Sequence, residues 1–139
     1  MRVSHLAFTA DENYLIISAE SGGGLAVYSV AQLNTGTTQT AFEVGTNGEA
    51  LRVLLPNPTP EKAELCAVLT SNGNLYMANL NTRTLSAPLK SQVSSISWST
   101  RGKQLVAGMA DGTIHQMTPE GEIKAEIPKP PGVGDYHGK

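Results

Sequence analysis

The sequence has little of what several classes of protein depend on. It contains one cysteine, Cys66, which leaves no partner for an internal disulfide, so we expect a reducing compartment such as the cytosol or the nucleus. It has no apolar run approaching about 18 residues, the length that marks a membrane-spanning helix. Lysine and arginine number 10 against 12 aspartates and glutamates, so no strong positive field can hold a nucleic-acid backbone. From these absences we expect no membrane-spanning segment and no direct binding of nucleic acid.

A secretory signal is also missing from the first residues. Asp11 and Glu12 interrupt this stretch before the apolar core of a signal could form, so we expect no secretion. Hydrophobic residues make up 40% of the 139 residues and charged residues 16%, which is typical of one folded domain and not of a disordered chain.

The chain repeats itself. Residues 3–25 read VSHLAFTADENYLIISAESGGGL, and residues 93–114 read VSSISWSTRGKQLVAGMADGTI, an offset of 90 positions. The apolar pairs that match at this offset are Val3 with Val93, Leu6 with Ile96, Phe8 with Trp98 and Leu15 with Leu105. A less regular copy lies between them. It begins with Leu51 and places Leu65 on Leu105, at a separation of 40. A period of roughly 40–45 residues is typical of propeller blades and of some helical repeats.

The residues inside each period favour strands. The last copy divides into the short runs VSSISWS, QLVAGMA, TIHQMT and EIKAEIP, which are separated by turns that each contain glycine. Asn72-Gly73 and Asp111-Gly112 occupy the same place in their copies, and such pairs favour tight hairpin turns because both central residues can take positive φ. No run has the apolar spacing of a long helix. Four short antiparallel strands in each copy describe a blade of a β-propeller.

We therefore predict an all-β fold, a WD-like β-propeller segment of about three four-stranded antiparallel blades. The blades are expected over residues 3–45, 51–90 and 93–128, followed by a Pro/Gly-rich connector or tail over 129–139. The segments AQLNTGTTQT and PNPTPEKAE are expected to be surface connections without regular structure. Because propellers close with about four to eight blades, we expect a fragment of a larger propeller, or a chain that another chain completes.

The residues that could carry chemistry do not form a recognisable site. His5, His115 and His137 lack metal-ligand spacing, and we expect the first two to be residues of blade faces. Cys66 lies within LCAVL and is expected to be buried. No Gly-x-Ser-x-Gly elbow is present, so we assign no catalytic, metal or cofactor-binding residue and predict that the chain is not an enzyme.

Other features allow two interpretations each. The stretch SGGGL, residues 21–25, lacks the following helix of a phosphate loop and is expected to be a hairpin turn. Arg101 and Lys103 form either a solvated hairpin tip or a charged contact for a partner. PKPPG, residues 128–132, is either a connector or a polyproline ligand. Trp98 is expected to pack between blades.

Residues 91–131 resemble a blade of the N-terminal propeller of the cytoplasmic-face Phe-Gly nucleoporins, through Trp98-Ser99, GKQL at 102–105 and Gly112-Thr113. The Gly-His and Trp-Asp dipeptides of standard WD repeats are absent. The resemblance implies that the chain forms about the second to fourth blades of seven. It also implies a non-enzymatic platform at the cytoplasmic face of the nuclear pore complex, in the nuclear envelope. There the family docks the DEAD-box helicase of mRNA export, and regions outside this chain would contact other nucleoporins. It assigns no contact residue in this chain.

Two other functions remain open. A generic WD-like scaffold or adaptor of another complex would have the same fold and different flanking regions. A propeller enzyme would place acidic residues or histidines at the start of the innermost strands, but these runs start at Val3, Leu51 and Val93. The sequence assigns no partner-binding residue, because fold alone does not settle function.

Overall fold

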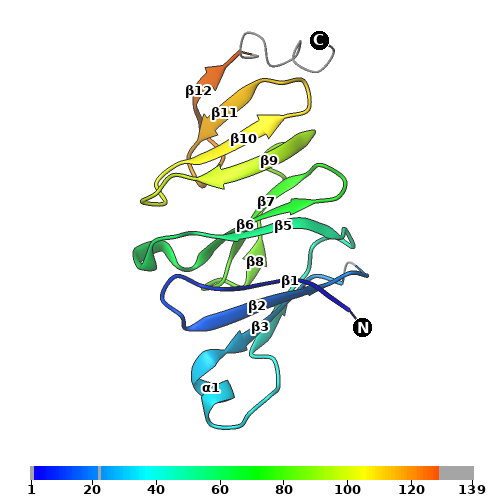
Figure 1. Cartoon of the computed structure of the whole chain (residues 1–139), viewed down its shortest axis with the longest axis vertical. Helices are drawn as coiled ribbons and strands as arrows, with labels where there is room; N and C mark the ends of the chain where they lie inside the picture. The colour runs from blue at the N-terminus through cyan, green and yellow to red at the C-terminus, as the bar shows by residue number, and fades with distance from the viewer. Residues whose placement is uncertain (1, 22, 129–139) are drawn as a thin grey trace, which may run out of the picture.

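The fold is a stack of three four-stranded antiparallel sheets, which follow one another in chain order (Figure 1). The computed structural model describes residues 2–21 and 23–128. The first sheet consists of β1 (Val3–Phe8), β2 (Tyr14–Ala19), β3 (Leu25–Ser29) and β4 (Phe42–Val44). The second consists of β5 (Leu51–Pro56), β6 (Leu65–Thr70), β7 (Leu75–Asn79) and β8 (Thr84–Leu85). The third consists of β9 (Val93–Trp98), β10 (Leu105–Met109), β11 (Ile114–Met117) and β12 (Ile123–Ile127).

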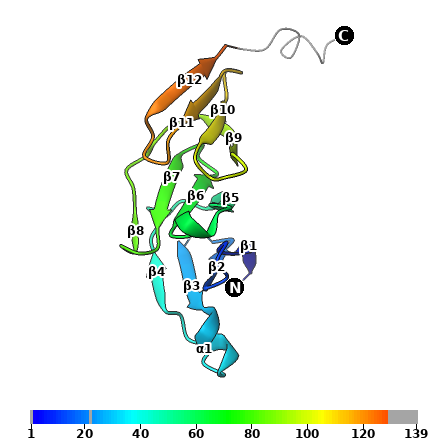
Figure 2. The same cartoon turned by 90° about the vertical axis from the view of Figure 1, so that its left-hand side faces the viewer.

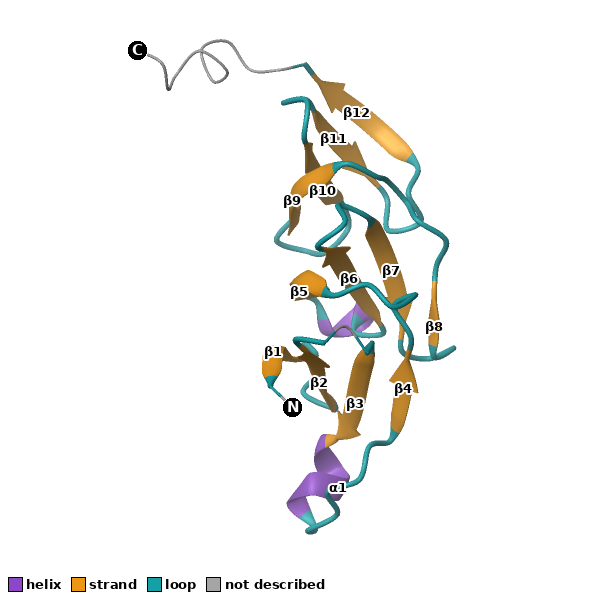
Figure 3. Cartoon of the chain, turned by 90° about the vertical axis from the view of Figure 1, so that its right-hand side faces the viewer, coloured by secondary structure: helices purple, strands orange, loops and turns teal. Residues whose placement is uncertain are grey.

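The strands of each sheet are hydrogen-bonded in chain order. As a result the first strands β1, β5 and β9 line one side of the stack, and β4, β8 and β12 line the other (Figures 2 and 3). This is the arrangement of neighbouring blades in a propeller, whose first strands surround the central axis. The predicted all-β propeller segment is confirmed. The connector predicted over 129–139 lies outside the described residues.

The hairpin turns differ in detail from the prediction. In the β6–β7 turn the Thr70 carbonyl accepts from the N–H of Gly73 at 3.0 Å, and only Gly73 has positive φ, at +84°. Gly112 repeats this geometry between β10 and β11, at +94°. Both are type I turns followed by a left-handed glycine, so the expectation that both central residues take positive φ was wrong. The glycine alone supplies the conformation that lets each hairpin close.

Apolar side chains fill the two spaces between the sheets. Between the first and second sheets lie Ile16, Leu25, Val27, Val44, Leu51, Leu54, Cys66, Val68, Tyr76, Ala78 and Leu80. Between the second and third lie Ala67, Leu69, Leu75, Met77, Val93, Leu105, Ala107 and Met117. Full burial of one Val, Leu, Ile or Met side chain contributes about 1.5–3 kcal/mol, so these two layers supply most of the cohesion of the stack.

The alignment of the middle copy was wrong by one residue. In the third sheet Leu105 pairs with Trp98 at the end of β9, and in the second sheet Cys66 pairs with Pro56 at the end of β5. Cys66 is therefore the counterpart of Leu105, and the separation is 39. Leu65 packs toward the third sheet and Cys66 toward the first. A shift of one residue turns every side chain of a strand to the opposite face, which is why the error matters.

The two connections predicted to lack regular structure each contain a short helix. In the first, α1 (Val30–Asn34) begins at Ser29, whose Oγ accepts from the N–H of Gln32 at 3.3 Å. In the second, the 3₁₀ helix η1 (Pro60–Lys62) begins with proline, whose fixed φ suits the first helical position. A side-chain cap in the first segment and a proline at the first helical position in the second therefore override the coil-like composition. No helix in the described part of the chain has the length and apolarity to cross a membrane.

Among the described residues, no sheet covers the outer face of the first sheet. Leu6 is 65% exposed and Phe8 is 56% exposed on the outer face of the first sheet. Their counterparts at the offset of 90, Ile96 and Trp98, pack against the core between the second and third sheets. The prediction that Trp98 packs between blades is confirmed, whereas Phe8 has no sheet against it. The outer face of the first sheet therefore carries the same kind of apolar side chains as the face of the third sheet that packs on the second.

Candidate partner-binding surface

The two histidines in the described residues, His5 and His115, do not converge on a site. His5 lies on β1, and its Nε2 is 2.9 Å from the carbonyl oxygen of Arg52 in the second sheet. His115 lies on β11 with its Nε2 3.7 Å from a carboxylate oxygen of Glu126. His137 lies outside the described residues. Within 2–21 and 23–128, no three His, Cys, Asp or Glu side chains lie close enough together to hold a metal ion.

Cys66 is fully buried in β6, as predicted. Burial raises the pKa of its thiol to about 12, because the thiolate would lose its hydration in the apolar layer. A thiol that stays protonated and inaccessible is a poor nucleophile. Cys66 therefore acts as a small apolar residue of the core.

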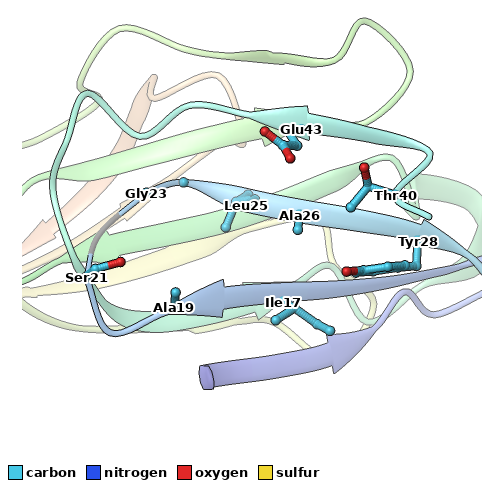
Figure 4. Close-up of a pocket in the computed structure, with 10 residues that line it drawn as sticks. Ile17, Ala19, Ser21, Gly23, Leu25, Ala26, Tyr28, Thr40 and Glu43 are labelled. Carbon is cyan, nitrogen blue, oxygen red and sulfur yellow. The ribbon is translucent and has the colours of Figure 1, made fainter. Parts of the chain in front are cut away.

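The described residues of the glycine-rich stretch, Ser21, Gly23 and Gly24, lie in the hairpin connection between β2 and β3, as predicted. Gly24 has a φ of +108°, and a Cβ at this position would lie 2.7 Å from the carbonyl oxygen of Val44. Beside it a hollow of about 230 Å³ opens on the first sheet (Figure 4). It is lined by Ile17, Ala19, Ser21, Gly23, Gly24, Leu25, Ala26, Tyr28, Thr40 and Glu43. The hollow is mainly apolar and adjoins the uncovered outer face of the first sheet.

The carboxylate of Glu49, in the connection between β4 and β5, accepts hydrogen bonds from three side chains of the second sheet. Glu49 Oε1 accepts from Thr70 Oγ1 at 2.7 Å and from Asn74 Nδ2 at 3.0 Å, and Oε2 accepts from the Tyr76 hydroxyl at 2.7 Å. The bonds from Tyr76, Asn74 and Thr70 hold the pKa of Glu49 below its usual value of 4.5. Sequence analysis missed this cluster, because Glu49 is separated from its partners by more than twenty positions.

Glu49→Gln is expected to lower the free energy of unfolding of the complete propeller by about 1–2 kcal/mol at neutral pH, because a neutral amide is a weaker acceptor. The pKa of Glu49 is lower in the folded state, so its contribution is complete above pH 4.5 and is lost as the pH falls through the lowered pKa. Urea unfolding from neutral pH to below pH 4.5 would measure both effects. Glu12→Gln, at an exposed turn, is the control, and equal stability of the two variants at neutral pH would contradict the prediction.

A buried asparagine joins the second and third sheets at one end of the stack. Asn57 is fully buried, and its Nδ2 donates to the carbonyl oxygen of Gly102 at 2.9 Å. Its Oδ1 accepts from the N–H of Thr59 at 2.9 Å. A Cβ on Gly102 would lie 2.1 Å from Asn57 Oδ1, so this contact requires glycine at 102. The hydrogen bond from Asn57 to Gly102 holds the β5–β6 connection against the β9–β10 turn. Both segments lie at the left in Figure 1.

Two adjoining hollows lie over this junction, and together we name them the junction groove. The first, of about 380 Å³, is lined by Pro58, Thr59, Pro60, Glu61, Lys62, Thr100, Arg101 and Lys103. The second, of about 340 Å³, is lined by Leu55, Pro56, Pro58, Ile96, Ser97, Trp98, Ser99 and Thr100. Pro58 and Thr100 border both hollows. The structure thus places Arg101 and Lys103 in a groove beside Lys62, a neighbour that the sequence did not indicate.

Trp98 is the one aromatic residue among the described residues that line the apolar half of the junction groove. Its Nε1 donates to the carbonyl oxygen of Leu55 at 2.9 Å, which satisfies the indole N–H and joins β9 to β5. The ring is half-buried, so one part packs on the core and another part is open to the groove. An amphipathic aromatic side chain in this position is typical of a surface that contacts proteins.

Comparison with known proteins places the chain among nucleoporin propellers. Residues 1–138 match a family model described as the NUP159/214 beta propeller. The chain is 66% identical to nucleoporin NUP159 of Chaetomium thermophilum, over 99% of this chain and 10% of that protein. It is 37% identical to nucleoporin nup146 of Schizosaccharomyces pombe, over 57% of this chain and 6% of that protein. It is 28% identical to nuclear pore complex protein Nup214 of Drosophila melanogaster, over 95% of this chain and 8% of that protein. The chain therefore spans a tenth or less of the length of these relatives.

Proposed function

Because the chain belongs to the NUP159/214 β-propeller family, we propose that it forms part of a docking platform for other proteins at the nuclear pore complex. The match of residues 1–138 to the family is the observation that carries this proposal. The remaining blades, which we propose number about four to complete a ring of seven, come from elsewhere in the same chain or from another chain. Regions outside the propeller would contact other nucleoporins.

The stack supports a role in binding and not in catalysis. Propellers bind partners through loops held on a rigid set of sheets, and here the β5–β6 connection and the β9–β10 turn are joined by a buried hydrogen bond. The innermost strands begin with Val3, Leu51 and Val93, none of which can act as an acid, base or nucleophile. We therefore propose a non-enzymatic scaffold.

The partner we propose for the complete propeller is the DEAD-box RNA helicase of mRNA export, at the cytoplasmic face of the pore. This rests on the family resemblance, which also assigns much of the helicase contact to later blades. The role of this segment is then to support the ring that displays those blades. The proposal gives the chain a place in nucleocytoplasmic transport without direct contact to RNA.

Titration of the purified helicase into the full-length protein by calorimetry is expected to show saturable binding. The variant with Arg101→Glu and Lys103→Glu is expected to bind the helicase as tightly as wild type, because both residues lie outside the proposed contact. If the wild-type protein fails to bind the helicase, the helicase proposal is wrong. If the variant alone fails while remaining folded by circular dichroism, the helicase contact includes this segment.

A further inference from the structure

Three cations from two sheets border the junction groove. Lys62 ends η1 in the β5–β6 connection of the second sheet, and Arg101 and Lys103 belong to the β9–β10 turn of the third. Arg101 and Lys103 are exposed and Lys62 is half-buried. Within the described residues, none of the three forms an ion pair. Glu61 is the one carboxylate among the described residues that line this half of the groove. The net charge of this half is therefore positive.

The backbone that carries these cations is fixed from both sides. The Asn57 side chain holds Gly102, the residue between Arg101 and Lys103, at 2.9 Å. Ser99 Oγ accepts from the N–H of Lys103 at 3.1 Å, which closes the turn from within. The backbone of the turn is therefore fixed before a partner arrives, so binding does not have to order the turn itself.

The fold itself does not require positive charge in this turn. The β1–β2 turn of the first sheet has the same shape, with Thr9 in place of Ser99 and Glu12 at a φ of +60° in place of Gly102 at +70°. At the offset of 90, Asp11 stands in the place of Arg101. The same turn thus carries a carboxylate in one blade and a guanidinium in another, so the cations are a property of the surface and not of the turn.

The distribution of charge and apolar surface identifies the ligand class. The cations adjoin an apolar hollow that contains Trp98 and Ile96, whereas Asp11 and Glu12 make the neighbouring turn of the first sheet acidic. An extended phosphate backbone running along this end of the stack would meet those carboxylates and be repelled. A short peptide can place carboxylates on the cations and one apolar side chain in the hollow.

We infer that the junction groove binds a short acidic peptide segment of a partner protein. Its carboxylates pair with Lys62, Arg101 and Lys103, and an apolar side chain between them packs on Trp98. This inference does not rest on the helicase proposal, because it concerns a different surface and its test uses a synthetic ligand.

The probe is a short fluorescein-labelled peptide of glutamates around one central phenylalanine, titrated into the full-length protein and followed by fluorescence anisotropy. Wild type is expected to bind it saturably, and Arg101→Glu with Lys103→Glu is expected to raise Kd by about tenfold or more. The matched control, Arg2→Glu with Lys124→Glu, makes the same change in net charge at two exposed positions outside the groove that take part only in surface ion pairs, and it is expected to change Kd by less than about twofold.

A second peptide with the opposite charge distinguishes loss of the charge contact from misfolding of the variant. The same peptide with lysines in place of glutamates is expected to bind the Arg101→Glu, Lys103→Glu variant more tightly than it binds wild type. The inference is overturned if wild type does not bind the acidic peptide, or if both double variants lose affinity equally. It is also overturned if oligouridylate RNA displaces the peptide and binds more tightly, which would make the groove a nucleic-acid site.

Discussion

Leu105→Ala is expected to lower the free energy of unfolding of the complete propeller by about 2–5 kcal/mol. Leu105 is fully buried and lies in the apolar layer between the second and third sheets, beside Ala107 and Met117. Truncation removes apolar contacts and leaves a cavity, because strands on both sides are held by their hydrogen-bonded neighbours and cannot close around it. Urea unfolding followed by circular dichroism would measure the change in free energy.

The control for this substitution keeps the volume of the side chain. Leu105→Met is expected to cost less than about 1.5 kcal/mol, because methionine fills a similar space and adapts its shape. If the alanine and methionine variants unfold at the same urea concentration with the same slope, the layer between the sheets is not packed as the structure describes.

Leu6→Ala is expected to lower the free energy of unfolding of the complete propeller by about 2–3 kcal/mol, although Leu6 is 65% exposed in this chain. This expectation rests on the repeat, in which position 6 of the first sheet corresponds to position 96 of the third. Its counterpart Ile96 faces the preceding sheet and packs on it, so the same position of the first sheet should face a preceding blade. Phe8 lies on the same face and is 56% exposed. Such apolar surface is costly to leave in water.

Thr38→Ala is the control for Leu6→Ala, because Thr38 lies in the exposed connection between α1 and β4 and touches neither layer. A surface substitution of this kind changes stability by about 0.5 kcal/mol or less. If Leu6→Ala were equally mild in the complete propeller, the outer face of the first sheet would not be a blade interface, and the idea of a preceding blade there would be wrong.

Much of the fold could be predicted because its signals are local. The period, the glycine-containing turns and the short apolar runs each depend on a few neighbouring residues. They identified the all-β class, the four strands of each sheet and the packing position of Trp98. Burial of Cys66 was also predictable, since its neighbours in LCAVL are apolar. The two short helices were missed, because a single helical turn has too weak a sequence pattern to distinguish it from coil.

The candidate surface was less predictable than the fold. Arg101 and Lys103 stood out as a possible partner contact, but the sequence offered no reason to prefer this over a solvated turn. The proposal that they form a partner contact depends on Asn57 and Lys62, which come from another blade, and Asn57 is 45 positions from its partner Gly102. Contacts at such a separation leave no local pattern in a single sequence.

The sequence by itself determined that the chain forms repeated antiparallel sheets, because strand alternation and turn chemistry act over a few residues. Only the tertiary structure decided which face of each strand packs and which loops meet. The one-residue error that put Leu65 in the place of Cys66 shows the reason: each strand has two faces, and the neighbouring sheet selects between them. The same stacking brings Lys62 to Arg101 and Lys103 and leaves Leu6 and Phe8 on an open face.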